Sequence, residues 1–351
     1  MPVEPPQSLA VIGGRVGDRV DALLAGEQER WAAVDSELVE PFTALRAFVA
    51  GGKRLRPAFC HWGWVGAGGV ADDPRVVDAG SALELLHAFA LLHDDIMDDS
   101  ARRHGAPCVH VDFAARHAAR TWHGEGRRFG DGAAILIGDL AFVYADQLLQ
   151  GAPAAALEVF TELRLEVNIG QYLDLVGTAS RAATPAQAHT ICVYKSGKYT
   201  IERPLHLGAA LAGRLDDLGK AYTAYGLPLG EAFQLRDDLL GAFGEDDRLG
   251  KAVGEDLRDG KPTALYALAR ERAAGAGARL LADRFGQADL TEDEVTALQD
   301  VYEETGARRA VEERVETLVA EALAALAEAP LDRRPRGELE ALARFVAGRD
   351  H

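Results

Sequence analysis

Residues 91–105 have the sequence LLHDDIMDDSARRHG, in which four carboxylates end a long apolar run and two arginines follow at once. The run is apolar on more than one helical face, which predicts a core helix whose acidic residues lie where it leaves the core. On a helix, Asp94 and Asp95 are i,i+4 and i,i+3 neighbours of Asp98, so the three carboxylates converge on one side. Like charges this close repel each other unless a divalent cation lies between them.

The donor atoms near this cluster favour a hard cation. Carboxylate oxygens without a nearby cysteine suit magnesium, which usually keeps part of its water shell and bridges to a substrate phosphate. Arg102 and Arg103 supply planar donor groups that match phosphate oxygens. The stretch therefore combines a metal-binding half with an anion-binding half, although a solvated acidic helix end flanked by arginines has the same local pattern.

A second apolar helix carries adjacent carboxylates farther along the chain. Residues 233–241 have the sequence FQLRDDLLG, which delivers Asp237 and Asp238 from an apolar helix in the same way. The repeated pattern favours two facing acidic clusters that form a metal cage over two unrelated solvated helix ends.

The composition predicts an all-α protein. Of the 351 residues 48% are hydrophobic, which is ample for a sizeable core, and only 7% are aromatic, while Ala, Leu, Glu and Arg recur throughout. No run of alternating Val, Ile and Thr is long enough for a strand, and no internal repeat or low-complexity linker divides the chain. We therefore expect a single all-α domain over residues 1–351, with residues 1–15 as a flexible amino-terminal tail.

Charge and cysteine content exclude several classes of protein. The formal net charge of −17 argues against binding to nucleic acid or anionic membrane, because either needs a broad basic surface. Three scattered cysteines are too few for a disulfide framework or a zinc site, which favours a reducing cytoplasm. The chain begins with no signal segment, and no uninterrupted apolar span of membrane length is expected, so we predict no stable membrane anchor.

Three further segments have compositions that suggest binding or movement. Residues 51–57, GGKRLRP, place three cations between two glycines and a helix start near Pro57, a plausible anion cradle. Residues 194–200, YKSGKYT, interrupt a helical pattern and predict a helix break that frees carbonyls, or a simple glycine kink. The polar stretch 243–263 is typical of a loop and, beside a metal site, of a lid.

These motifs, in this order, resemble those of the trans-type isoprenyl diphosphate synthases, the polyprenyl synthetase family, over nearly the whole chain. The matching segments are Gly52 to Pro57, Asp94 to Asp98 with Arg102 and Arg103, Gly170-Gln171 with Asp174, Lys195-Ser196, Gln234 with Asp237-Asp238, and Gly250-Lys251 with Lys261. Each motif alone is weak, but the ordered set is specific. The resemblance implies an isoprenoid-synthase-type bundle of antiparallel helices around a central cavity.

The resemblance also implies a reaction, in which magnesium-assisted ionisation of an allylic diphosphate precedes condensation with isopentenyl diphosphate. The expected magnesium ligands are Asp94, Asp95, Asp98, Asp237 and Asp238. The cations expected on the allylic diphosphate are Arg102, Lys195, Lys251 and Lys261, and those expected on isopentenyl diphosphate are Lys53, Arg56, His87 and Arg103. Oxygen dipoles directed at the carbocation are expected from Gln171, Ser196 and Gln234. A homodimer is also implied.

Three positions depart from the family pattern, and two others bear on product length. Gly241 stands where a third aspartate is common, Ser196 stands for a threonine, and Leu249 precedes Gly250-Lys251 where threonine is usual. The residues before the first motif form the floor for the growing chain in the family. Bulky Phe89 with small Ala90 resembles enzymes that stop at geranylgeranyl diphosphate, as in bacterial geranylgeranyl diphosphate synthases; farnesyl or longer polyprenyl products are the alternative.

Two readings of another kind compete with a synthase. A class I terpene cyclase also has an aspartate-rich first motif, but its Asn, Ser, Glu metal triad is absent here: Asn168 is the only asparagine, and Tyr172 and Val176 occupy the other two positions. A non-catalytic regulatory subunit is expected to lack an intact aspartate motif, whereas this chain keeps the first motif whole. The synthase is therefore the expected function.

Overall fold

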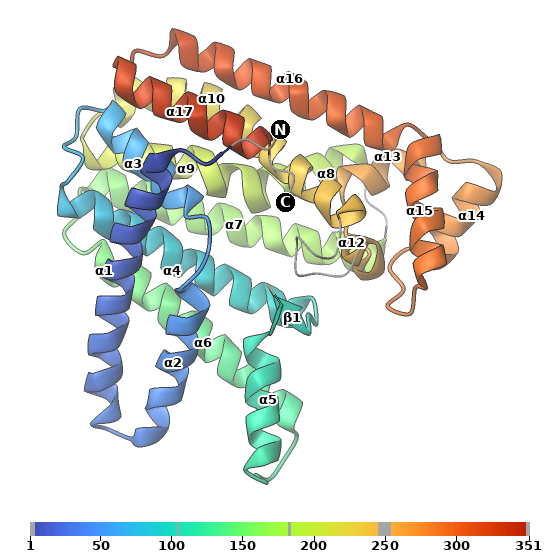
Figure 1. Ribbon diagram of the computed structural model, residues 1–351, viewed down its shortest axis with the longest axis horizontal. Coiled ribbons are helices and arrows are strands. Elements are labelled where there is room, and N and C mark those ends of the chain that lie inside the picture. Colours follow the sequence, from blue (N-terminus) through green and yellow to red (C-terminus); the bar gives the residue numbers. More distant parts are fainter. Residues whose placement is uncertain (1–3, 104, 182–183, 245–253, 349–351) are drawn as a thin grey trace. The chain divides into compact units, whose positions relative to one another are not determined.

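The computed structural model describes residues 4–103, 105–181, 184–244 and 254–348. Over these ranges the chain is helical apart from one short hairpin, which confirms the predicted all-α class (Figure 1). The chain groups into two compact units. The amino-terminal unit comprises Gln7–Leu157 and Leu207–Gly213, and the carboxyl-terminal unit comprises Met1–Pro6, Glu158–His206 and Arg214–His351. The expectation of a single domain stays a prediction.

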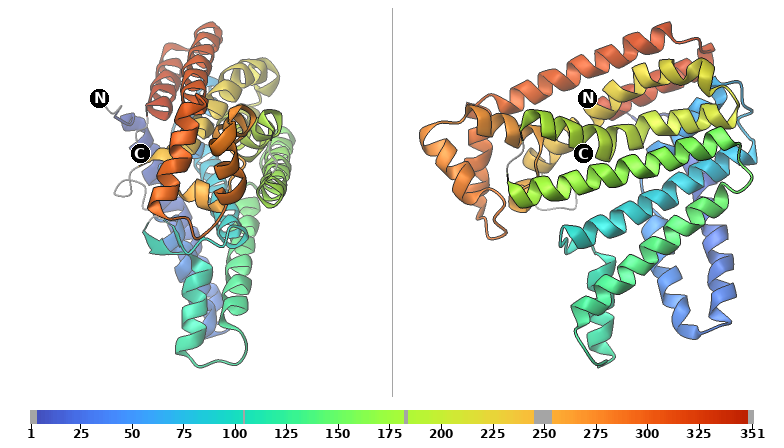
Figure 2. Two further views of the ribbon diagram at one scale, coloured as in Figure 1. Left: turned by 90° about the vertical axis from the view of Figure 1, so that its right-hand side faces the viewer. Right: turned by 180° about the vertical axis from the view of Figure 1, so that it is seen from behind.

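Helix α4 is the centre of the amino-terminal unit and packs against its other α-helices. Figure 2 shows α6 alongside α4 from a second direction. The elements of this unit are α1 (Gln7–Ala32), η1 (Ser36–Leu38), α2 (Val39–Val49), α3 (Leu55–Gly66), α4 (Pro74–Met97), β1 (Arg102–Arg103), β2 (Ala106–Pro107), α5 (Val109–Ala119) and α6 (Gly126–Leu148). Strands β1 and β2 pair antiparallel.

The sequence around α4 explains both its start and its burial. The Asp73 side chain accepts a hydrogen bond from the Arg75 N–H at 2.9 Å, and Pro74 occupies the first helical position. By length and composition α4 is apolar enough to cross a membrane, but 61% of its most apolar window is buried inside the protein. Helix α4 is therefore a core helix.

The amino-terminal segment differs from the expected tail. Helix α1 begins at Gln7, so most of residues 1–15 is helical. The side chains of Leu9 and Ile12 are buried, because α1 packs against α2, α3 and α4. The helical part of the segment 1–15 therefore begins at Gln7.

Helix α10 is the centre of the carboxyl-terminal unit and packs against η2, α12, α13, α16 and α17. The elements of this unit are α7 (Ala154–Ser180) and α9 (Arg203–Leu211), each of which is shared with the other unit, α8 (Pro185–Ile191), η2 (Cys192–Glu202), α10 (Leu215–Phe243), α12 (Glu255–Asp259), α13 (Ala264–Arg272), α14 (Gly275–Arg284), α15 (Glu292–Glu304), α16 (Ala307–Glu328) and α17 (Arg333–Ala347).

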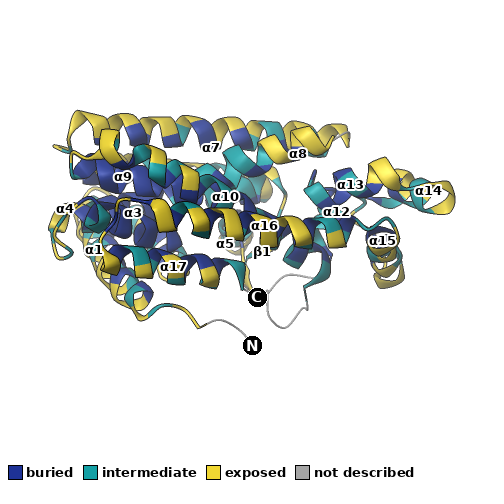
Figure 3. Ribbon diagram, turned by 90° about the horizontal axis from the view of Figure 1, so that it is seen from above, coloured by how far each residue is buried: buried dark blue, intermediate teal, exposed yellow. Residues whose placement is uncertain are grey.

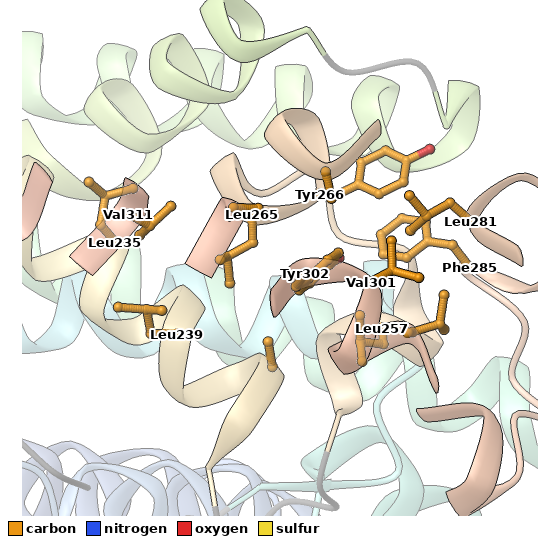
Figure 4. Packing of buried hydrophobic residues seen from close by; sticks show 14 of the residues in the cluster. Leu235, Leu239, Leu257, Leu265, Tyr266, Leu281, Phe285, Val301, Tyr302 and Val311 are labelled. Carbon is orange, nitrogen blue, oxygen red and sulfur yellow. The ribbon is translucent and has the colours of Figure 1, made fainter. Parts of the chain in front are cut away.

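A buried apolar cluster connects α10 with the helices that follow it in sequence (Figure 4). The rings of Tyr266 and Phe285 stack with centroids 3.8 Å apart and an angle of 5° between their planes. Leu257 of the five-residue helix α12 is 1% exposed and belongs to the same cluster. Burial of this leucine attaches α12 to the core, although the helix is too short to be stable alone.

Candidate active site

The first acidic cluster lies at the carboxyl end of α4. Asp94 and Asp95 are in its last turn, and Asp98 caps the helix by donating its N–H to the Asp94 carbonyl at 2.9 Å. The residue Asp95 is only 1% exposed, whereas Asp94 and Asp98 are half-buried. The end of α4 therefore carries all three carboxylates of the first motif.

Arg103 pairs with this cluster from the hairpin that follows α4. Its guanidinium lies 2.6 Å and 2.8 Å from Asp95 Oδ1, through Nη2 and Nε, and 3.7 Å from Asp94 Oδ2. Burial disfavours the charged guanidinium, but Asp95 and Asp94 outweigh this effect and raise the pKa of Arg103. Successive strand residues point to opposite faces, and Arg102 is exposed and donates to the Gly105 carbonyl. The structure thus gives the two arginines different environments.

The other carboxylate oxygen of Asp95 makes the site receptive to a cation. Asp95 Oδ2 is buried and has no hydrogen-bond partner among the described residues. A buried carboxylate oxygen without a donor costs free energy, which a bound cation recovers. Oxygen ligands of this kind fit magnesium, which binds one or two carboxylates together with phosphate oxygens. Within the described ranges, no three His, Cys, Asp or Glu side chains gather as a group that alone holds a metal ion.

The basic turn before α3 is fixed by Arg54. This residue has a φ of 53° and is buried, and its guanidinium pairs with Glu84 of α4. Lys53 on one side is exposed, and Arg56 on the other is half-buried in the first turn of α3. His87 is half-buried on α4, about one turn after Glu84. The three cations of the sequence motif are therefore not equivalent, because Arg54 attaches the turn to α4.

The two residues expected to limit product length lie on α4, about one turn before the acidic cluster. Phe89 and Ala90 are both half-buried. The Phe89 ring packs against Phe142 of α6, with centroids 4.8 Å apart, and against the His93 imidazole at 4.6 Å. The bulky side chains near Ala90 therefore come from two helices, α4 and α6. Phe142 was not identified from the sequence, because its contact with Phe89 depends on how α6 packs against α4.

The second acidic cluster lies near the end of α10. Asp238 is buried, Asp237 is half-buried, and the Gln234 amide donates to Asp238 Oδ1 at 2.7 Å. Burial raises the pKa of Asp238 well above its ordinary value, and the charges of Asp256, Asp237 and Asp174 raise it further against the opposing Gln234 hydrogen bond. Negative charge is concentrated around this buried carboxylate, which is an environment that stabilises a bound cation.

Asp256 reaches this cluster from α12. A Cβ atom placed on Gly241 would lie 2.1 Å from Asp256 Oδ2 and 2.6 Å from Asp256 Cγ. The Asp256 carboxylate therefore occupies the space next to α10 that any side chain at position 241 needs. Asp256 has no metal-binding pattern of its own in the sequence, because only the folded chain shows which carboxylate of the polar stretch 243–263 returns to α10.

Asp174 of α7 brings two of the expected lysines together. Lys195 Nζ lies 2.7 Å from Asp174 Oδ2, and Lys261 Nζ lies 3.9 Å from the same oxygen. Asp174 is buried, and its charge also acts on Asp238. The two lysines and the second acidic cluster therefore share this carboxylate as a neighbour. The predicted Lys251 lies outside the described residues.

The segment that carries Lys195 and Ser196 is a π-helix, η2, rather than the predicted break. The chain stays helical from α8 through η2 into α9, and the wider turns of a π-helix are frequent at functional sites. Helix α7 approaches η2 closely, since a Cβ atom on Gly170 would lie 2.3 Å from the Lys195 backbone nitrogen. Gln171, the next residue of α7, is half-buried, as is Ser196.

Buried ion pairs connect the later part of η2 to α7 and α9. Glu166 of α7 pairs with Lys198 of η2 and with Arg203 of α9, whose Nε lies 2.6 Å from Glu166 Oε2. Burial alone raises the pKa of Glu166, but the two cations outweigh burial and lower it. Because Glu166 is fully engaged by cations, it serves the structure of η2, whereas Asp174 lies next to the candidate site.

Comparison with known proteins gives consistent matches over most of the chain. The family model for polyprenyl synthetase matches residues 40–303. The short chain isoprenyl diphosphate synthase of Methanothermobacter thermautotrophicus is 32% identical over 319 residues, which cover 84% of this chain and 92% of that protein. The (2E,6E)-farnesyl diphosphate synthase of Mycobacterium bovis is 31% identical over 307 residues, covering 85% of this chain and 80% of that protein.

A solved structure matches the whole fold. The geranylgeranyl pyrophosphate synthase from Corynebacterium glutamicum, in complex with isoprenyl diphosphate and magnesium, superposes with a TM-score of 0.92 and 36% sequence identity. The match covers 97% of this chain and 99% of that chain. The relatives agree in the class of reaction that their names describe and differ in the length of the named product.

Proposed function

The chain belongs to the polyprenyl synthetase family, and we propose that it condenses isopentenyl diphosphate with allylic diphosphates to give geranylgeranyl diphosphate. As a member it is a trans-prenyltransferase, an isoprenyl diphosphate synthase. The observation that carries the proposal is the pair of acidic helix ends, α4 with buried Asp95 and α10 with buried Asp238. Each of these two helix ends presents carboxylates in surroundings that stabilise a bound cation.

Magnesium is the metal that we propose for both clusters. The ligands are Asp94, Asp95 and Asp98 on α4, and Asp237 with support from Asp238 on α10. Bound magnesium supplies Lewis-acid charge that neutralises the allylic diphosphate as it leaves. The support is Asp95 Oδ2, which has no hydrogen-bond partner in the part of the chain that the structure describes, together with the negative surroundings of Asp238 and the magnesium in the Corynebacterium glutamicum complex.

The chain's own cations bind and orient the two diphosphates. We assign Arg102, Lys195, Lys251 and Lys261 to the allylic diphosphate, and Lys53, Arg56, His87 and Arg103 to isopentenyl diphosphate. Asp174 holds Lys195 at 2.7 Å, with Lys261 at 3.9 Å, which positions these two ammonium groups for an incoming anion. Gln171, Ser196 and Gln234 are proposed to direct oxygen dipoles at the carbocation, because dipoles stabilise positive charge without reacting with it.

Product length is proposed to be limited by the aromatic pair Phe89 and Phe142. Two rings with centroids 4.8 Å apart form a bulkier barrier than Phe89 alone. The experiment is a product assay with purified protein, magnesium, labelled isopentenyl diphosphate and, in turn, dimethylallyl, geranyl and farnesyl diphosphate as primers. Wild-type product that ends at geranylgeranyl diphosphate, and longer product from Phe89→Ala, support the proposal. Farnesyl or longer wild-type product overturns the length assignment, and hydrocarbon product favours a terpene cyclase.

A homodimer is proposed from an exposed apolar stripe on α7. The α7 stripe consists of Leu165, Ile169, Tyr172 and Val176, which are 54%, 54%, 66% and 45% exposed and share one helical face because they are spaced three or four residues apart. Figure 3 shows that one side of α7 is exposed. Exposed apolar patches of this kind mark protein interfaces. Light scattering should give twice the chain mass for wild type and the monomer mass for Leu165→Glu with Ile169→Glu. A wild-type monomer contradicts the proposal.

A cytoplasmic location is also proposed. The three cysteines are free thiols and all are buried, as in proteins of a reducing compartment.

A further inference from the structure

Helix α6 carries Gly138 and Asp139 in the middle of its apolar run, and the proposed function assigns no role to either residue. Gly138 is buried on α6, which packs against α4. A Cβ atom at this position would lie 2.5 Å from His93 Nε2 and 2.6 Å from His93 Cδ2. Even an alanine at position 138 would therefore displace the imidazole of His93. The glycine leaves the space in which this imidazole lies.

A hydrogen bond anchors the His93 imidazole to α6. Its Nε2 lies 3.1 Å from the Ile135 carbonyl oxygen, which can only accept, so Nε2 carries the proton and donates. The carboxylate of Asp139 lies 3.7 Å from the same nitrogen, through Oδ1, and favours a proton there. The His93 side chain is only 18% exposed. The backbone of α6 therefore fixes the position of an imidazole that belongs to α4.

The anchored imidazole contacts Phe89, one turn earlier on α4. The two residues are i,i+4 neighbours and lie on the same helical face. The centroid of the Phe89 ring lies 4.6 Å from that of His93 and 4.8 Å from that of Phe142 on α6. Ring pairs at these distances attract each other beyond the burial of their surfaces. Two other rings thus hold the Phe89 side chain, and one of them depends on Gly138.

We propose that His93 is a positioning residue for product length: anchored on α6 beside Gly138, its imidazole holds the Phe89 ring in place against the growing prenyl chain. Without the imidazole, the Phe89 side chain can rotate into the space that His93 leaves, and a longer chain fits. The inference rests on the proposed function and adds a group that acts through Phe89. The competing role of His93 is support of the adjacent Asp94, which would change the rate of condensation but not the product length.

Product length at saturating magnesium tests the proposal. The measured quantity is the ratio of products longer than the main wild-type product to that product, which does not depend on how much of the enzyme is folded. His93→Ala should raise this ratio about fivefold, the effect of losing one aromatic contact. Turnover and the thermal midpoint are recorded for each variant, because a role in the fold alone lowers both and leaves the ratio unchanged.

Two glycines of α6 provide a matched pair of variants. Gly138→Ala keeps both Phe89 and His93 but displaces the imidazole, so it should raise the product ratio by about as much as His93→Ala does. Gly132→Ala adds the same methyl group to the same helix, at a position where a Cβ atom meets nothing within 4 Å. This control should keep the product ratio within about twofold of wild type.

A double variant shows whether the glycine acts through the imidazole. In the His93→Ala background there is no imidazole to displace, so adding Gly138→Ala should change the product ratio by less than about twofold. The double variant should also have a higher thermal midpoint than Gly138→Ala alone, because the steric conflict is gone. It therefore tests the proposal even where Gly138→Ala alone does not fold. A further large increase in the ratio contradicts the assigned role of Gly138.

The outcomes separate this inference from the proposed function. Failure of the wild-type protein to condense isopentenyl diphosphate overturns the proposed function, and the role of His93 with it. Condensation with an unchanged product ratio in Phe89→Ala overturns the aromatic barrier and therefore also this inference. A raised ratio in Phe89→Ala together with an unchanged ratio in His93→Ala overturns only the role of His93.

Discussion

The two acidic clusters begin with the same pair of adjacent aspartates and have opposite electrostatic surroundings. At the end of α4, buried Asp95 is paired with the Arg103 guanidinium at 2.6 Å. At the end of α10, buried Asp238 accepts a hydrogen bond from the neutral Gln234 amide and is surrounded by carboxylates, among them Asp256. The chain itself partly neutralises the first cluster, whereas the second is neutralised by a proton or a bound cation.

The difference separates two uses of a buried carboxylate. Breaking the ion pair of the first cluster leaves an uncompensated buried charge, so the pair supports the fold. In the second cluster the crowded negative charge costs stability until a cation binds, so binding and stability oppose each other. Variants at the two helix ends should therefore change the stability of the metal-free protein in opposite directions.

The largest effect is expected at Asp94. Asp94→Ala should reduce the condensation rate about a thousandfold or more, because a magnesium ligand for the leaving diphosphate is lost. The fold should remain, since Asp94 is half-buried at a helix end. Steady-state turnover and circular dichroism measure the two properties. Asp99→Asn removes an exposed carboxylate nearby, paired with Arg127, and should keep activity within about twofold. Substantial turnover in Asp94→Ala contradicts the metal clamp.

The next effect is a loss of stability at Arg103. Arg103→Met leaves Asp95 buried without its cation, so the free energy of unfolding in the absence of magnesium should fall by roughly 3 kcal/mol. Magnesium should recover part of this loss. Urea unfolding measures both values. Arg127→Met breaks an exposed pair and should cost less than about 1 kcal/mol. An equal loss of unfolding free energy in Arg103→Met and Arg127→Met contradicts the predicted cost of leaving buried Asp95 without its cation.

Replacing Asp238 is expected to change the free energy of unfolding in the opposite direction from Arg103→Met, and by less. Its pKa in the folded protein is above the ordinary 3.8, so the folded state binds the proton more tightly than the unfolded chain. Its contribution to stability is therefore fully present below pH 3.8 and is lost as the pH rises through the folded-state pKa. Asp238→Asn should remove that loss and stabilise the metal-free protein at neutral pH by about 1 kcal/mol or more.

Urea unfolding of wild type and Asp238→Asn across a pH series, without magnesium, tests this sign. The difference in unfolding free energy between the two proteins should grow with pH above 3.8 and then level off. A constant difference at all pH values contradicts the predicted titration. The variant should also gain less stability from magnesium with inorganic diphosphate than wild type does.

Local sequence patterns predicted the helices that carry the aspartates but not the contacts around them. At the start of α8, Thr184 and Gln187 form a capping box, a local pattern that can be read from the sequence. Nothing local distinguishes Arg54, which is buried on Glu84, from its exposed neighbour Lys53. Such differences depend on which helices pack together, and tertiary packing is absent from a periodicity pattern.

The same limit applies to the site. The residues Asp174 and Asp256 act on Asp238 from α7 and α12, which are distant from it in sequence. At Lys195 the chain continues as a π-helix that packs closely against Gly170 of α7, whereas composition alone suggested a break there. Motif order identified the family because each motif is a short local stretch of sequence, whereas the approach of Asp256 to Gly241 is visible only in the folded chain.

The most direct test of the account is the metal dependence of condensation. Purified protein is treated with a chelator, and turnover of labelled isopentenyl diphosphate with geranyl diphosphate is then followed as free magnesium is restored. If the aspartates hold magnesium as proposed, no prenyl product forms without divalent metal, and magnesium restores turnover in wild type but not in Asp94→Ala. Turnover that persists after metal removal, or recovery in Asp94→Ala equal to wild type, contradicts it.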